Sequence, residues 1–127
     1  MEKTVIHTEN APAPFQGAPY SQAIRVGDLV FVAGQIGNKP GESSIEGDIT
    51  AQTEQVLRNL AAILEAAGSS LANLVKTSVF LQDLGDFTAM NEVYARHVGD
   101  RPPDRSTFEV AKLPSGAIVE IEAVAHL

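Results

Sequence analysis

The sequence predicts an α+β domain in which a mixed sheet of five or six strands carries two helices on one face. Two segments place apolar residues at helical spacing, and six shorter segments are rich in β-branched and aromatic residues. These elements follow one another in the order β-ββ-α-β-α-ββ. Two helices can cover only one face of such a sheet, so the fold class already implies an uncovered face.

The N-terminal third predicts three strands. Residues 4–8 form a short β-prone segment, and a proline-rich loop then interrupts the chain. Residues 23–26 and 29–34 are apolar runs separated by Gly27-Asp28. A two-residue turn of this kind between two apolar runs indicates a β-hairpin.

The first helix is predicted over residues 49–67, after a polar loop that ends near Gly47. Apolar residues recur there at helical spacing, and Asp48 is suited to cap the first turn. Gly68 is suited to end the helix as the first residue beyond its C-cap.

The C-terminal half predicts a strand, a second helix and two further strands. Residues 75–81 form the strand, and residues 87–98 show helical spacing that ends at Gly99. Residues 105–110 and 117–125 are the two last strands.

The last of these strands is apolar on both of its faces. Val119 and Ile121 point one way, while Val124 shares the other face with Glu120 and Glu122. The second strand of the predicted hairpin is likewise apolar at nearly every position. A sheet with two apolar faces and helices for only one predicts that the second face is buried against other copies of the chain.

Composition restricts the classes of function. The 127 residues suit a single domain, and the net charge of −7 with nine scattered lysines and arginines argues against nucleic acid or anionic lipid as partners. The chain has no cysteine, and its three histidines lack metal-ligand spacing. No apolar run approaches the roughly 20 residues of a membrane span, and no export signal opens the sequence. We therefore expect a cytoplasmic protein without a metal or membrane partner.

Arg105 is the first candidate site residue, because it opens a strand directly after Pro102-Pro103-Asp104. Arg105, Thr107 and Glu109 would occupy outward positions of this strand. A guanidinium held in this way can bind a carboxylate through two parallel hydrogen bonds. The alternative is a surface arginine paired with Asp104 or Glu109, a contact that contributes roughly 0 to 1 kcal/mol.

Glu120 and Tyr20 are further candidates. Glu120 lies within an apolar strand, where partial burial would raise its pKa toward a value useful for proton transfer. The alternative is that Glu120 and Glu122 line a solvated edge strand. The hydroxyl of Tyr20 could hang over a cleft, or the ring could simply pack. Asn91 shares its helix with an apolar stripe and, if it faces inward, needs a hydrogen-bond partner such as a nearby loop.

Eight short motifs together resemble the RidA family, also called YjgF or the reactive intermediate deaminase family. They are Ala18-Pro19-Tyr20-Ser21-Gln22-Ala23, Val30-Phe31-Val32-Ala33-Gly34-Gln35, Gln52-Thr53-Glu54-Gln55, Val75-Lys76-Thr77, Phe80-Leu81, Asn91-Glu92-Val93-Tyr94, Arg105-Ser106 and Val119-Glu120-Ile121-Glu122-Ala123. Their order and spacing are consistent over nearly the whole chain, so residues 1–127 are expected to form one RidA-like domain.

The resemblance implies a chorismate-mutase-like fold and a homotrimer in which the sheets form a central barrel. It also implies hydrolysis of reactive enamines and imines, such as 2-aminoacrylate, to 2-keto acids and ammonia, without a cofactor. The implied sites are clefts between subunits. In them Arg105 binds the substrate carboxylate, Glu120 positions and activates water, and Tyr20 lines the pocket. The substrate-binding set that the resemblance implies also includes Gly34, Asn91 and Thr107.

Three positions depart from the family pattern. Ala33 replaces a frequent serine, Thr107 stands where some relatives have cysteine, and Asp104 replaces a usual alanine and could compete for Arg105. These departures leave open a regulatory trimer that binds small carboxylates without turnover. A ribonuclease or translation inhibitor is a third reading, against which the acidic composition argues.

Overall fold

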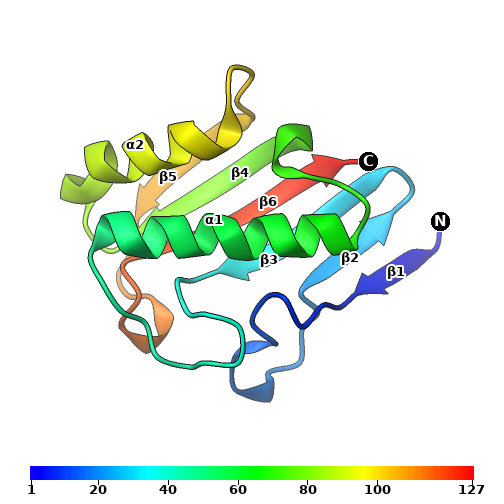
Figure 1. The fold of residues 1–127 in the computed structure, drawn as a ribbon, viewed down its shortest axis with the longest axis horizontal. Coiled ribbons are helices and arrows are strands. Elements are labelled where there is room, and N and C mark those ends of the chain that lie inside the picture. Colours follow the sequence, from blue (N-terminus) through cyan, green and yellow to red (C-terminus); the bar gives the residue numbers. More distant parts are fainter.

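The computed structural model describes residues 1–127 as one six-stranded sheet with two helices packed on the same face (Figure 1). The elements are β1 (Lys3–Ile6), β2 (Ala23–Val26), β3 (Leu29–Gln35), α1 (Ile49–Ala66), β4 (Leu74–Leu81), α2 (Phe87–Val98), β5 (Asp104–Glu109) and β6 (Val119–His126). This confirms the predicted fold class and the predicted order of elements.

The strands lie in the order β1-β2-β3-β6-β4-β5. All neighbours are antiparallel except β4 and β5, which are parallel. A parallel pair needs a long crossover, and α2 supplies it. The consecutive strands β5 and β6 are not neighbours, because β6 inserts between β3 and β4. Strand β5 therefore lies at an edge of the sheet.

The predicted helix ends and hairpin turn are confirmed. The Asp48 side chain accepts a hydrogen bond from the backbone N–H of Ala51 at 3.0 Å, which caps α1. Gly68 follows the helix with a φ of +86°, a conformation that favours glycine. Gly27 has a φ of +58° in the two-residue turn between β2 and β3.

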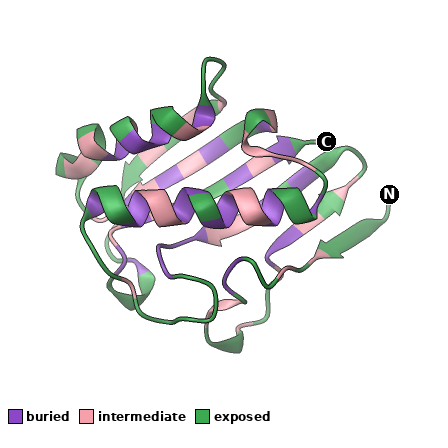
Figure 2. Ribbon diagram, viewed as in Figure 1, coloured by how far each residue is buried: buried purple, intermediate pink, exposed green.

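The core lies between the helices and the sheet, as the buried stripe along α1 shows (Figure 2). Its fully buried members include Val30, Val56, Leu57, Leu60, Ile63, Leu64, Val79, Leu81, Met90, Val119, Ile121 and Ala125. Each such side chain contributes roughly 1.5 to 3 kcal/mol by leaving water, although conformational entropy offsets most of the sum. Neither helix has the length and apolar character needed to cross a membrane.

The opposite face of the sheet carries no helix and exposes large apolar side chains. Leu29, Phe31 and Phe108 are 42%, 45% and 51% exposed, and Val124 on β6 is half-buried. The two-sided apolar character predicted for the sheet is therefore present. Its burial against other copies of the chain stays a prediction.

Candidate functional site

The predicted site residues fall into two groups on opposite faces of the sheet. Arg105 on β5 is the register partner of Thr77 on β4, a buried residue on the helix-covered face. Glu120 on β6 alternates with the core residues Val119 and Ile121, so its side chain projects from the helix-free face. Strand β4 also separates β5 from β6. A single chain therefore does not bring Arg105 and Glu120 together.

The first group, the arginine half-site, consists of Arg105, Thr107, Asn91, Phe87 and Tyr94. The guanidinium carbon of Arg105 lies 4.8 Å from the centre of the Tyr94 ring and 5.4 Å from that of Phe87. Thr107 lies two residues further along β5 and shares the face of Arg105. Both residues face the helix side beside α2, so the outward placement expected from the sequence is wrong. The prediction that Arg105 and Thr107 share one face of β5 is correct. Alternation along a strand does not say which of its two faces the helices cover.

No carboxylate of the chain pairs with Arg105. Asp104 projects from the other face of β5, and its Oδ1 lies 3.5 Å from Nζ of Lys76. Glu109 accepts a hydrogen bond from the backbone N–H of Leu84 at 3.0 Å. The ordinary ion pair considered for Arg105 is thus not formed.

Asn91 carries a buried acceptor without a partner. It lies on α2 four residues after Phe87 and three before Tyr94, so the three side chains share one stripe of the helix. Its Oδ1 is buried and accepts no hydrogen bond, so this oxygen does not cap a loop. An unsatisfied buried acceptor costs about 1 to 3 kcal/mol. A donor from a ligand or a second chain would remove this cost.

The second group, the glutamate half-site, surrounds a cavity of about 380 Å³ on the helix-free face. Tyr20, Gly34 and Glu120 line it together with Phe15, Ala18, Ala33, Ile36 and Pro114. Burial, and secondarily the like charge of Glu122, raise the pKa of Glu120 above its ordinary value of 4.5. A carboxyl group with a raised pKa is suited to both accept and return a proton.

Gly34 is needed because of its close approach to Glu120. A Cβ atom at residue 34 would lie 2.9 Å from Cδ of Glu120 and closer still to Oε2, although the backbone φ of Gly34 is not positive. The register of β3 and β6 also shifts between Val32 and Gln35, an interval that includes this glycine. The signal available in the sequence was a glycine inside an otherwise apolar strand.

Tyr20 reaches the same cavity from the loop before β2. Its hydroxyl oxygen accepts a hydrogen bond from the backbone N–H of Phe15 at 2.6 Å. Because this bond uses a lone pair, the hydroxyl hydrogen remains available to a group in the cavity. Tyr20 is 43% exposed as a residue, so it is not a core packing residue.

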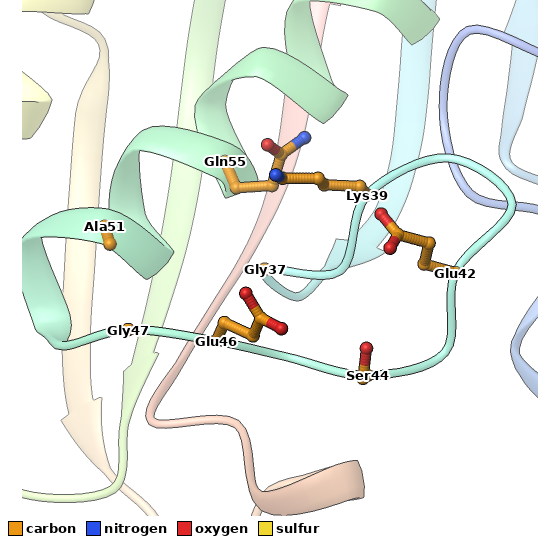
Figure 3. Close-up of a pocket in the computed structure, with 8 residues that line it drawn as sticks. All are labelled: Gly37, Lys39, Glu42, Ser44, Glu46, Gly47, Ala51 and Gln55. Atoms are coloured by element: carbon orange, nitrogen blue, oxygen red, sulfur yellow. The ribbon is translucent and has the colours of Figure 1, made fainter.

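A second cavity of about 350 Å³ lies between the loop that precedes α1 and the first turns of that helix (Figure 3). Its charged lining residues are Lys39, Glu42 and Glu46, with Ser44 and Gln55 beside them (Figure 3). It contains no residue of either half-site.

A six-stranded sheet with two helices on one face defines the class of this protein as a small α+β protein of the chorismate-mutase-like, YjgF type. Residues 8–127 match the family described as "Endoribonuclease L-PSP". The chain belongs to this family, the YjgF/RidA family, as the motifs of the sequence indicated.

Two relatives and one solved structure illustrate the similarity. A RutC family protein of Pyrococcus horikoshii is 52% identical over 125 residues, which cover 98% of each chain. The chloroplastic Reactive Intermediate Deaminase A of Arabidopsis thaliana is 44% identical over all of this chain and 67% of its own. The crystal structure of RidA from an Antarctic Psychrobacter has a TM-score of 0.93 at 42% identity, covering 98% of this chain and 99% of that one. Family and relatives together support a deaminase of the Rid type.

Proposed function

We propose that this protein is a cofactor-free hydrolase that converts reactive enamines and imines of the 2-aminoacrylate type to 2-keto acids and ammonia. The observation that carries the proposal is that the chain presents two unusual groups, one on each face of the sheet. Arg105 is a guanidinium without a carboxylate partner, and Glu120 is a half-buried carboxyl group with a raised pKa. A 2-imino acid presents a carboxylate to the first group and a carbon open to water to the second.

The two half-sites are complementary between chains rather than within one. Their side chains project from opposite faces of the sheet, so a small ligand that touches both requires a second copy. The exposed apolar face around Phe31 and Phe108 provides the surface against which that copy would pack. We take the assembly to be a homotrimer, in which each cleft joins the arginine half-site of one subunit to the glutamate half-site of its neighbour.

In this cleft Arg105 orients the substrate by two parallel hydrogen bonds to its carboxylate. An enamine becomes an imine without catalysis, and the carbon of a protonated imine is already electrophilic. Glu120 takes a proton from water as the water oxygen bonds to this carbon. The carboxyl group returns this proton to nitrogen, which makes the amine a leaving group. Glu120 then takes the proton of the new hydroxyl group as the C=O bond forms and the C–N bond breaks. It passes this proton to the departing ammonia, so a 2-keto acid and ammonium leave.

The rate acceleration that this reaction needs from the protein is modest. Proton transfer by a positioned group typically contributes about 10²- to 10⁴-fold, which suffices for a substrate that also decays spontaneously. The remaining contribution is orientation, supplied by the arginine half-site. The free hydroxyl hydrogen of Tyr20 can donate a hydrogen bond to the attacking water or to the adduct that this water forms with the imine carbon.

The proposal is tested by supplying an amino acid together with an oxidase or dehydratase that releases its imine. The purified protein is expected to accelerate 2-keto acid formation, and Arg105→Ala is expected to abolish the acceleration. The matched control is Arg101→Ala, which removes the same charge from an exposed position four residues earlier. Equal rates for Arg105→Ala and the wild type would refute the role of Arg105 as the carboxylate anchor.

A regulatory carboxylate-binding protein remains the second candidate, because a free guanidinium binds a carboxylate whether or not turnover follows. Calorimetry with 2-ketobutyrate and rate measurements on Glu120→Gln separate the two. A deaminase loses its rate in this variant and still binds the keto acid. A purely regulatory protein binds the keto acid, and neither it nor the variant accelerates the reaction.

The description of the family also names an endoribonuclease. The net charge of −7 and the single cation of the arginine half-site offer no groove for a phosphate backbone. RNA binding that weakens steeply with salt, together with RNA cleavage lost in Arg105→Ala, would favour that activity over deamination.

A further inference from the structure

Arg105 is supported by aromatic rings instead of by a carboxylate. Tyr94 and Phe87 of α2 place their ring centres 4.8 Å and 5.4 Å from the guanidinium carbon. Both distances lie within the range in which a ring attracts a cation. A carboxylate partner would occupy N–H donors of the guanidinium and neutralise its charge. The faces of aromatic rings attract the cation without neutralising its charge or accepting its in-plane N–H hydrogen bonds.

Tyr94 is itself buried and hydrogen-bonded. Its hydroxyl and Oγ1 of Thr77 lie 2.6 Å apart, which is a short hydrogen bond between two buried side chains. Thr77 is also the register partner of Arg105 on the neighbouring strand. The three residues come from β4, α2 and β5, so this contact ties the helix to the sheet at the place where the arginine emerges.

We infer that Tyr94, fixed by Thr77, is a positioning residue that sets the orientation of Arg105 for binding the carboxylate of a 2-imino or 2-keto acid. This inference rests on the proposed function, since it assumes that Arg105 is the carboxylate anchor. Without the Tyr94 ring beneath it, the long arginine side chain would sample several rotamers. Fixing one of them when a ligand binds would then cost conformational entropy and weaken binding.

The protonation state of Tyr94 suits this role. Burial raises the pKa of the Tyr94 hydroxyl above its ordinary value of 10.0, while the Thr77 hydrogen bond and then the positive charge of Arg105 act in the opposite direction. The side chain therefore stays a neutral phenol in the neutral range. A phenolate beside Arg105 would compete with the ligand carboxylate, whereas a neutral ring leaves the full positive charge available.

The test uses two nearly isosteric substitutions, each of which removes one hydroxyl. Tyr94→Phe keeps the ring and loses the bond to Thr77, and Thr77→Val loses the same bond from the other side. Each is expected to raise the Kd for 2-ketobutyrate by about fivefold, the effect of one net hydrogen bond. The double variant is expected to match either single variant, because all three lack the same bond. Tyr94→Leu, which also removes the ring, is expected to raise the Kd by up to about thirtyfold.

Kinetic and conservative variants distinguish positioning from mere stability. KM for the imine is expected to rise in Tyr94→Phe while kcat stays near that of the wild type. Thr77→Ser keeps the hydroxyl group that Thr77→Val removes, so it is expected to bind 2-ketobutyrate as the wild type does. Unchanged Kd and KM in Tyr94→Phe and Thr77→Val, with only a lower Tm, would overturn the inference while Arg105→Ala still abolishes binding. If Arg105→Ala also binds normally, the proposed function fails instead.

Discussion

Replacing Gly34 by alanine tests whether the position of the Glu120 carboxyl group matters. The added Cβ would lie 2.9 Å from Cδ of Glu120, whereas ordinary contact begins at 3.4 Å. The carboxyl carbon must therefore retreat by about half an ångström, and its nearer oxygen by more. Misplacement of a reacting group by about 1 Å costs on the order of 10²-fold in rate, so kcat is expected to fall by roughly 10- to 100-fold.

The fold is expected to tolerate this change. The φ of Gly34 is not positive, so alanine meets no backbone strain there, and the clashing atoms belong to the far end of a flexible side chain. The free energy of unfolding should change by no more than about 1 kcal/mol. The assay is 2-keto acid formation with an imine-generating enzyme, and calorimetry with 2-ketobutyrate reports separately on the arginine half-site.

A double-variant comparison shows whether the effect passes through Glu120. In a Glu120→Asp background, which keeps the carboxylate, the shorter side chain leaves room for the new methyl group, so Gly34→Ala is expected to cause a smaller further loss of kcat. A full wild-type kcat for Gly34→Ala, or an equal loss in both backgrounds, would show that Gly34 does not act by making room for the Glu120 carboxyl group.

Substitution of three carboxylate side chains, those of Glu120, Asp104 and Glu54, gives three further predictions. The raised pKa of Glu120 means that the folded state holds this proton more tightly, so stability falls as pH rises from 4.5 through the raised value. Thermal melts of Glu120→Gln should therefore show a gain in Tm at neutral pH that disappears below 4.5, and no gain at any pH would contradict this. Asp104→Asn should keep kcat/KM close to that of the wild type, because Asp104 faces Lys76; a marked rise would show that it restrains Arg105. The hydrogen bond from His97 lowers the pKa of Glu54, so this contact stabilises above the ordinary carboxyl pKa and is lost as pH falls through the lowered value. Urea unfolding of Glu54→Gln should show a loss of about 0.2 to 1 kcal/mol at pH 7 that shrinks at pH 3, and equal losses at both would argue against the pair.

Local patterns predicted the elements of the fold well. Helix ends at Asp48 and Gly68 and the turn at Gly27 depend on neighbouring residues only, and the structure confirms all three. The insertion of β6 between β3 and β4 was not predictable in the same way, because strand order depends on contacts between distant segments.

In the candidate site, too, local patterns predicted the residues but not the contacts between distant segments. Residue type and spacing identified Arg105 and Glu120, but alternation along a strand says only that neighbours differ in direction. Which face the helices cover decided that the two residues point to opposite sides of the sheet. Phe87 opens a helix predicted from its apolar spacing, and it remains 40% exposed beneath Arg105. The partners of Asp104 and Tyr94 are contacts between elements, which no local pattern contains.

In the proposed trimer each cleft takes its arginine from one chain and its glutamate from another. Arg105→Ala and Glu120→Ala chains carrying different tags are co-expressed, and trimers containing both are isolated by two affinity steps. A ring of three that mixes the two kinds of chain has one junction where an intact arginine half-site meets an intact glutamate half-site, so mixed trimers should show about one third of wild-type activity. Each variant alone should be inactive. Mixed trimers with no activity above that of the separate variants would contradict the account.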